Sequence, residues 1–189
     1  MIYIPRYYVY MEIDFARRLC RNMQGGTWRL KNRIIDTDVL IIGGGASGVT
    51  SGIQSARMGA NTLILEESTW LGGMLTSAGV SAVDGNYRLP AGLWGEFKNR
   101  LSDYYGGLDS LKTGWVSNVL FEPSVGNKIL HEMVAAENNL KVWKQACLEE
   151  VKRTGDEWVA KVKVEGQGVK TVRAKVMIDA TELGDVAKM

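Results

Sequence analysis

The sequence predicts an α/β fold in which a parallel sheet with one βαβ unit is followed by a three-stranded antiparallel meander. Three patterns predict this class. An apolar run rich in Val and Ile, residues 38–42, is followed at once by four glycines within six residues and then by a helical period. A second strand pattern returns at 61–67. Later, apolar and mostly charged side chains alternate over 158–165, which is typical of an antiparallel sheet with one face in water.

The first apolar run starts a complete supersecondary unit. A helix is expected at 46–58, because Val49, Ile53 and Ala56 share one helical face, and Gly59 is placed to end it. The strand "NTLILEE" follows. Strand, glycine turn, helix and strand within about 30 residues form one βαβ unit, whose crossover is expected to be right-handed.

The middle of the chain departs from a plain doubly wound fold, in which short αβ repeats would follow at once. A loop is expected at 68–90, then helices at 91–105 and 124–137, whose apolar residues recur at helical spacing. The short strand "LKVWKQ", 140–145, comes next. The helices are therefore expected to interrupt the sheet pattern rather than alternate with it.

Glycine-containing turns divide the last part of the chain. Three strands are expected between Cys147 and Ala174, separated by "TGD" and "GQG", and they form the meander. After it, "KVMIDAT", 175–181, predicts one more short buried strand that ends in small residues.

Composition is that of a soluble globular protein, with a formal net charge of +2 and 46% apolar residues. The charge is uneven, because residues 1–35 hold seven basic side chains against Glu12 and Asp14. Two parts are predicted: a basic, poorly ordered extension at 1–35 and one domain at 36–189. Tyrosines among the basic residues could meet a nucleic acid, but no cap, glycine turn or regular period organises this stretch. No nucleic-acid partner is therefore predicted.

Several classes of protein are disfavoured. No run approaches the roughly 18 apolar residues of a membrane span, and charged residues interrupt any secretory core near the start, so a cytoplasmic protein is predicted. Cys20 and Cys147 form no CxxC motif, and His131 is the only histidine. Because His131 lies opposite the apolar stripe of its helix, it is predicted to be solvated and non-catalytic. No metal site is predicted.

Gly43, Gly45 and Gly48 form a GxGxxG pattern between a strand and a helix. In this context the first glycine permits a tight turn, the second lets the backbone approach a pyrophosphate, and the third lets the helix pack on the sheet. The phosphates would lie at the helix N-terminus, beside Ala46 and Ser47, where unpaired N–H groups and the helix dipole favour an anion. A purely structural turn is the alternative interpretation.

Glu66 adds a second element, because it ends the next strand 18 residues after Gly48. A carboxylate at this point accepts hydrogen bonds from an adenosine ribose and repels a 2′-phosphate, which disfavours NADP. Glu67 is the alternative ribose ligand. These features alone do not distinguish an FAD-binding protein from an NAD-binding protein.

Motifs further along the chain favour FAD. With "WLGGML", the helical segment, the meander and "IDATELGD", residues 37–187 resemble the FAD-dependent oxidoreductases of the glutathione reductase-like superfamily, and most closely the group labelled xanthan lyase-like. The phrase "FEP", Phe121–Pro123, also matches the family. The resemblance implies a Rossmann-like FAD-binding domain. It also implies cofactor contacts by Gly72, Gly73, Met74, Thr76, Cys147, Ala180, Thr181 and Asp185. Where the family usually has glycine after Asp-Ala-Thr, this chain has Glu182.

The resemblance implies the N-terminal, FAD-binding portion of an oxidoreductase that passes hydride or electrons between a small-molecule substrate and an electron acceptor. Since family members carry further sheet strands and a substrate domain, the domain is expected to be incomplete at its C-terminus. No catalytic residue and no oligomeric state are predicted. The alternatives are a fragment of an NAD-dependent dehydrogenase and a truncated or non-catalytic nucleotide-binding module.

Overall fold

The computed structural model describes residues 34–115 and 117–189. Most of the predicted basic extension therefore lies outside the described residues. Its last two residues, Ile34 and Ile35, belong to the first strand, β1 (Ile34–Ile42), which begins earlier than the predicted residue 38. The reason is pairing: residues 34–37 of β1 run alongside residues 171–174 later in the chain.

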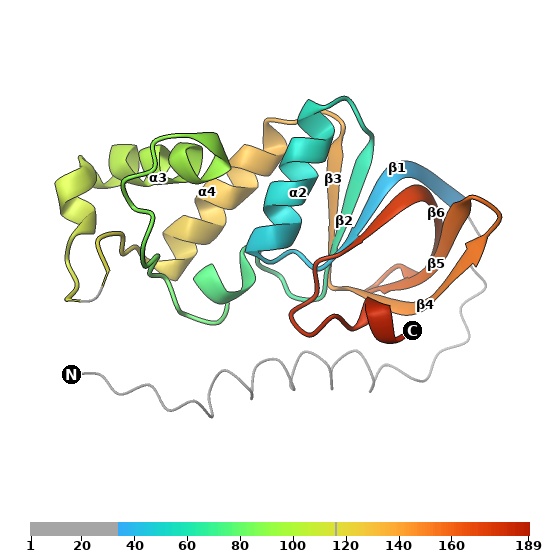
Figure 1. Ribbon diagram of the computed structural model, residues 1–189. Helices are drawn as coiled ribbons and strands as arrows, with labels where there is room; N and C mark the ends of the chain where they lie inside the picture. Colours follow the sequence, from blue (N-terminus) through green and yellow to red (C-terminus); the bar gives the residue numbers. More distant parts are fainter. Residues whose placement is uncertain (1–33, 116) are drawn as a thin grey trace.

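One six-stranded sheet organises the fold, in the order β3-β2-β1-β6-β5-β4 (Figure 1). The remaining strands are β2 (Thr62–Glu66), β3 (Leu140–Lys144), β4 (Ala146–Thr154), β5 (Glu157–Val164) and β6 (Gly168–Asp179). Strands β3, β2, β1 and β6 run parallel, whereas β5 is antiparallel to both β6 and β4. The predicted α/β class, the βαβ unit and the antiparallel meander are confirmed.

Among the described residues, three α-helices lie on one side of the sheet: α2 (Ala46–Arg57), α3 (Gly92–Tyr105) and α4 (Pro123–Ala135). α2 contacts β1 and β2, α4 contacts β3, and α3 packs on α4 farther from the sheet (Figure 1). Short 3-10 turns occur at η1 (Gly73–Leu75), η2 (Leu108–Leu111) and η3 (Val186–Lys188). In the described part of the chain, no helix has both the length and the apolar character to cross a bilayer.

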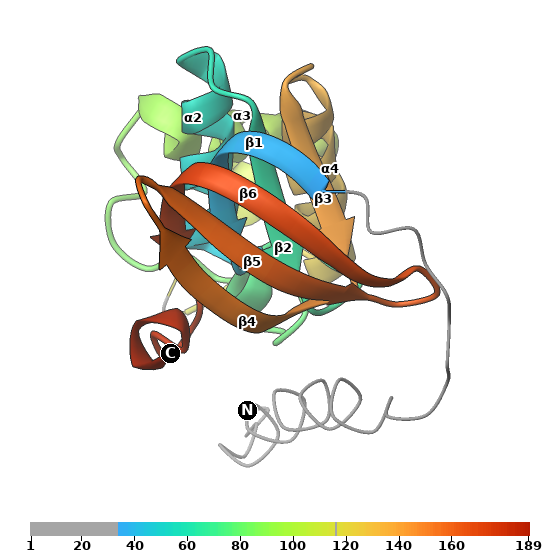
Figure 2. The same cartoon turned by 90° about the vertical axis from the view of Figure 1, so that its right-hand side faces the viewer.

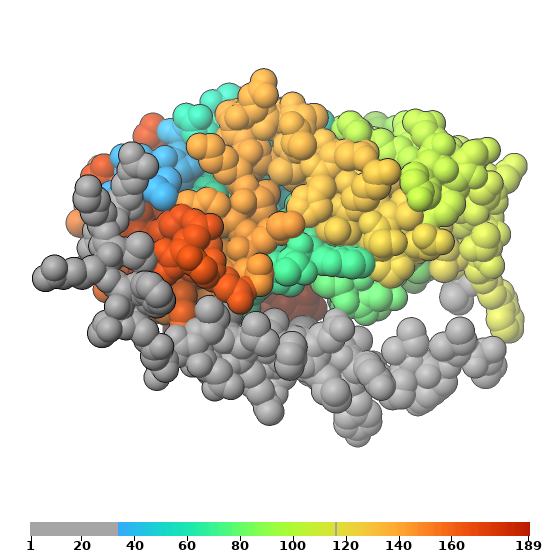
Figure 3. Space-filling view, turned by 180° about the vertical axis from the view of Figure 1, so that it is seen from behind, coloured from blue at the N-terminus to red at the C-terminus, as the bar shows by residue number. Residues whose placement is uncertain are grey.

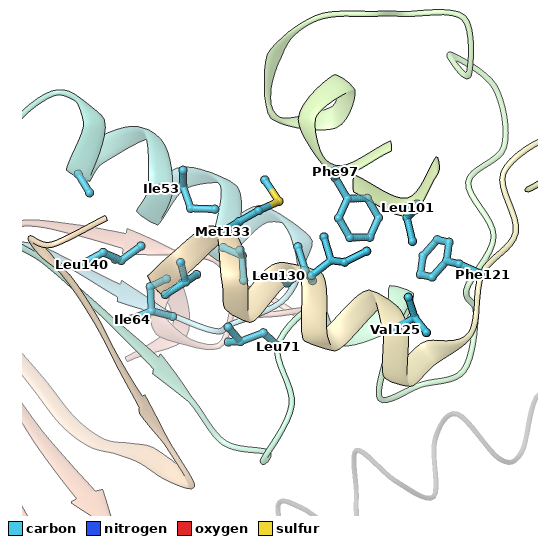
Figure 4. Packing of buried hydrophobic residues seen from close by; sticks show 14 of the residues in the cluster. Ile53, Ile64, Leu71, Phe97, Leu101, Phe121, Val125, Leu130, Met133 and Leu140 are labelled. Atoms are coloured by element: carbon cyan, nitrogen blue, oxygen red, sulfur yellow. The ribbon is translucent and has the colours of Figure 1, made fainter. Parts of the chain in front are cut away.

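Two apolar cores pack on opposite faces of the sheet, because successive side chains of a strand point to opposite faces. Toward the helices, Ile53 and Met133 pack with Ile64 of β2 (Figure 4). On the other face, Leu40 and Leu63 pack against residues of β4, β5 and β6. β2 and β4 contact each other although they are not neighbours in the sheet, so the sheet curls around this second core. In Figure 2 the meander strands β4, β5 and β6 lie in front of the rest of the sheet.

The predicted division near residue 174 is wrong, because the third meander strand and the "KVMIDAT" strand are one. β6 runs without a break from Gly168 to Asp179 and pairs with β5 at its start and with β1 from Thr171 onward. No turn-forming residue interrupts it, so the strand pairing continues through residue 174. Its second half is also less buried than expected, since Val176 is 51% exposed.

The packing of α2 gives a direct test of the first core. Ile53→Ala removes a side chain with no exposed surface and should lower the free energy of unfolding by about 2–5 kcal/mol. Met58→Ala, just past the same helix and 80% exposed, should change it by less than about 0.5 kcal/mol. Urea denaturation of the two variants measures the difference, and equal effects would contradict this packing.

Candidate cofactor-binding site

A cavity of about 240 Å³ lies beyond the carboxyl ends of β1, β2 and β6. This is where open α/β sheets bind their ligands. Four segments line it: the glycine turn after β1, the end of β2 with the loop that follows, the start of β4, and the loop after β6. The lining residues are Ile42, Gly43, Gly44, Gly45, Leu65, Glu66, Glu67, Ser68, Gly73, Ser77, Ala78, Ala146, Leu148, Ala180, Thr181, Glu182 and Asp185.

The glycines of the first turn have different surroundings. A Cβ atom on Gly43 would lie 2.5 Å from the carbonyl oxygen of Ala180, and one on Gly48 would lie 1.8 Å from the carbonyl oxygen of Gly43. Packing therefore requires glycine at both positions. A Cβ on Gly45 would meet nothing within 4 Å. Protein packing does not explain Gly45, which faces open space beside the cavity.

Helix α2 begins at the cavity and leaves its first amides available. Its N-cap residue is Gly45, and no side chain caps the helix. The first backbone bond of the helix runs from Val49 N–H to the Gly45 carbonyl oxygen at 2.9 Å, so the preceding N–H groups have no intrahelical acceptor. Ala46 and Ser47 are exposed there. Unpaired amides and the positive end of the helix dipole together favour an anion.

Backbone amides on either side hold the Glu66 carboxylate at the end of β2. The Gly44 N–H donates to Oε2 at 2.7 Å, and the Ser68 N–H donates to Oε1 at 2.7 Å. A Cβ on Gly44 would lie 2.7 Å from the same Oε2 atom, so only a bare backbone can come this close. Each carboxylate oxygen can accept a further hydrogen bond. Glu66 is thus a fixed acceptor at the cavity edge.

The second glycine pair runs beside the first turn. Gly72 has φ 104° and Gly73 has φ 51°, a region that favours glycine. The Gly72 N–H donates to the Gly44 carbonyl oxygen at 2.8 Å. A Cβ on Gly73 would lie 3.1 Å from the Gly45 Cα. Two stretches of bare backbone therefore lie side by side at the cavity.

Hydrogen bonds to Asp179 order the loop after β6. Its carboxylate accepts from the Thr181 hydroxyl at 2.6 Å and from the Thr181 and Ala187 N–H groups at 3.0 and 3.1 Å. Burial raises the pKa of Asp179, but these hydrogen bonds outweigh it and leave the pKa below its ordinary value. The Thr181 hydroxyl in turn accepts from the Asp185 N–H at 2.8 Å. These hydrogen bonds therefore hold the loop around the ionised carboxylate of Asp179.

Glu182 fits where the family usually has glycine. Among the described residues other than glycine, only Asn86 and Gln145 have positive φ, so Glu182 does not occupy the left-handed region. That conformation falls instead on Gly184, with φ 63°. The substitution therefore causes no backbone strain at this point.

The structure brings eight of the predicted cofactor residues to the cavity lining: Gly43, Gly45, Glu66, Glu67, Gly73, Ala180, Thr181 and Asp185. Ala46 and Ser47 start the adjacent helix, and Gly48 and Gly72 pack behind the lining. Three further predicted residues are not among the lining residues: Met74, which is half-exposed on η1, Thr76, which is buried, and Cys147.

Strand geometry explains the position of Cys147. Its neighbours Ala146 and Leu148 line the cavity, and the side chain between them points to the other face. Sequence reasoning missed Leu148, although period-two alternation from Ala146 indicates it. It also missed Ser68 and the role of the Gly44 N–H. No sequence signal identifies an amide that binds a side chain 22 residues away.

His131 on α4 is half-buried, which corrects the prediction of a solvated side chain. Its Nε2 atom is buried and has no hydrogen-bond partner among the described residues. Burial lowers the pKa of His131 below its ordinary value, and the positive charge of Lys144 lowers it further. The helical projection identified the face of α4 that packs on the first core. It could not show that α4 also contacts β3, whose last residue is Lys144.

The parallel sheet, the bare glycine turn and the cavity at its carboxyl edge define a Rossmann-like fold of the dinucleotide-binding type. A model of the FAD dependent oxidoreductase family matches residues 38–189, and the chain belongs to this family. Family membership confirms FAD as the predicted cofactor. The finer labels, glutathione reductase-like and xanthan lyase-like, stay predictions.

Several solved structures share the fold at low identity. The rebeccamycin biosynthetic enzyme RebC with reduced flavin has a TM-score of 0.60 and 16% identity, covering 82% of this chain and 34% of RebC. A flavoprotein/dehydrogenase from Cytophaga hutchinsonii has a TM-score of 0.59 and 16% identity, over 80% and 40%. OxyS anhydrotetracycline hydroxylase from Streptomyces rimosus has a TM-score of 0.55 and 13% identity, over 77% and 31%. The chain thus spans less than half the length of each. No curated protein sequence matches it.

His131 predicts a pH dependence of stability. Its pKa in the folded chain is lowered, whereas the unfolded chain has the ordinary value of about 6.5. The unfolded chain therefore binds the proton more readily, and the free energy of unfolding should fall as the pH drops below about 6.5. Because this is the only histidine, His131→Gln should remove most of the change between pH 7.5 and 5.5 in urea denaturation.

A Lys144→Gln variant provides the matched control. Removing this positive charge should bring the pKa of His131 closer to its ordinary value and weaken the pH dependence without abolishing it. An unchanged pH dependence in His131→Gln would show that another group is responsible.

Proposed function

We propose that the cavity binds the adenine dinucleotide portion of FAD, and that the protein is an oxidoreductase whose bound flavin exchanges hydride or electrons with a small-molecule substrate and an electron acceptor. The open space at Gly45 carries the proposal. Neighbouring glycines are required by protein packing, whereas the position where a Gly45 Cβ would lie is open space, next to the start of α2 and beside the Gly72–Gly73 pair. That room suits a diphosphate held by backbone amides.

The charges of the lining support amide binding of the diphosphate. The charged lining residues are Glu66, Glu67, Glu182 and Asp185, and within the described part of the chain no basic side chain lines the cavity. Attraction for the phosphates therefore comes from the amides and the dipole of α2. The surrounding carboxylates disfavour an additional 2′-phosphate. Such a site favours FAD over a 2′-phosphorylated dinucleotide.

The remaining predicted ligands have roles that agree with their positions. Glu66, held at the end of β2, accepts the ribose hydroxyls, with Glu67 beside it. The backbone at Ala146 and Cys147 would lie next to the adenine, and Ala180, Thr181 and Asp185, which line the cavity after β6, would contact the dinucleotide from that side. Gly43 and Gly48 shape the turn, while Ala46 and Ser47 offer amides. Gly72, Gly73 and Met74 lead toward the flavin end.

The cofactor supplies the redox chemistry, because the isoalloxazine ring of FAD accepts and returns electron pairs. The described residues bind and orient the dinucleotide, and none is assigned as a catalytic acid or base. The substrate and electron acceptor are proposed only by class. The chain spans 31–40% of the length of the three solved structures compared above.

The cofactor can be identified directly. We expect purified protein to be yellow, with a flavin absorbance band, and to release a compound on heating that chromatographs as FAD. Apoprotein should also regain the absorbance band when FAD is added. A colourless protein that binds NAD, or that binds neither dinucleotide, would overturn the proposal.

Two glycine substitutions separate cofactor binding from folding. Gly45→Val places methyl groups in the open space and should abolish retention of FAD, while the cap change costs the apoprotein no more than about 1 kcal/mol. Gly48→Ala puts a Cβ 1.8 Å from the Gly43 carbonyl oxygen and should destabilise the apoprotein by about 1–3 kcal/mol. Flavin stoichiometry and thermal unfolding measure the two effects. Wild-type FAD content in Gly45→Val would contradict the diphosphate position.

A further inference from the structure

Two side chains from outside the sheet hold the backbone of Leu71, immediately before the second glycine pair. The Leu71 N–H donates to Oδ1 of Asn127 on α4 at 2.9 Å. The Leu71 carbonyl oxygen accepts a short hydrogen bond from the Thr76 hydroxyl. The Leu71 side chain is itself fully buried. In Figure 3 the loop after β2 lies between α4 and the β3–β4 region.

The same contacts continue into the glycine pair. A Cβ on Gly72 would lie 2.6 Å from Leu130 Cδ1 and 2.8 Å from Thr76 Cγ2. The side chains of Leu130 on α4 and of Thr76 therefore pack closely against this residue and leave no room for a side chain there. On its other side, the Gly72 N–H donates to the carbonyl oxygen of Gly44. A continuous series of contacts therefore connects α4, through residues 71–73, to the turn at the cavity.

Packing also fixes α4 next to this loop. At Gly126, an added Cβ would lie 2.5 Å from the Phe121 ring and 3.3 Å from Thr76 Cγ2, so the helix approaches closely only because this position has no side chain. The next residue, Asn127, is half-buried and is a poorer helix former than alanine. Its use in the interior of α4 is therefore explained by its bond to the Leu71 N–H.

We propose that Asn127 and Thr76 are positioning residues for the cofactor diphosphate. Neither lines the cavity; they act through Leu71 by setting how closely Gly72 and Gly73 lie to Gly44 and Gly45. Thr76, for which the family resemblance implies contact with the cofactor, acts instead through the loop backbone. This inference rests on the proposed function, because it assigns two residues to the shape of the same binding site.

Isosteric pairs of variants test the two hydrogen bonds. Asn127→Leu and Thr76→Val each remove one partner of Leu71 and keep nearly the same volume. Each leaves a buried backbone group unpaired, and each should weaken FAD binding by about 10-fold. Asn127→Asp keeps the acceptor, and Thr76→Ser keeps the hydroxyl, so both should bind FAD within about 3-fold of wild type.

The measurements are titration of each apoprotein with FAD and hydrogen exchange of the Leu71 and Gly72 amides. Faster exchange at these amides in Asn127→Leu and Thr76→Val, together with weaker FAD binding, supports the proposal. Wild-type affinity in both variants would overturn it, and so would equal weakening by Asn127→Leu and Asn127→Asp. A wild-type protein that fails to bind FAD refutes the proposed function itself, so the two failures are distinguishable.

Discussion

The site depends on the close approach of bare backbone segments at the carboxyl edge of the sheet. Gly43 is in contact with the chain at Ala180, Gly44 with the Glu66 carboxylate, and Gly48 with Gly43 itself. A side chain at any of these positions would move β1, β2 or α2 relative to the others. Gly45 differs from them, because the space beside it remains open. The dense packing of its neighbours gives that opening a fixed shape.

The charged and polar groups at the site are also held in fixed positions. A helix start and a row of backbone amides provide modest positive potential, and they do so in fixed positions. The acidic residues are held just as firmly: Glu66 by two amides, and Asp179 by three hydrogen bonds. The cavity therefore offers donors to a diphosphate and acceptors to sugar hydroxyls in separate places. This division matches the chemistry of a dinucleotide better than that of an isolated phosphate.

Local patterns in the sequence predicted the parts of the fold that local residues determine. Val49, Ile53 and Ala56 mark α2 by their spacing, and the alternation at 158–165 marks β5. Family motifs added Gly72, Gly73 and the loop after β6. Contacts between distant segments were beyond such reasoning. The continuity of β6 depends on pairing with β1 along 171–179, and the burial of His131 depends on α4 contacting β3. The bond between Asn127 and Leu71 joins residues 56 positions apart.

The amide signals of the glycine turn test the central claim most directly. In a 15N–1H NMR titration of apoprotein with FAD, the amides of Gly45, Ala46, Ser47 and Gly73 should shift most and saturate together at one FAD per chain. Shifts confined to the opposite end of the sheet, around the Asp36–Arg173 ion pair, would contradict the account, because the diphosphate would then bind away from the turn.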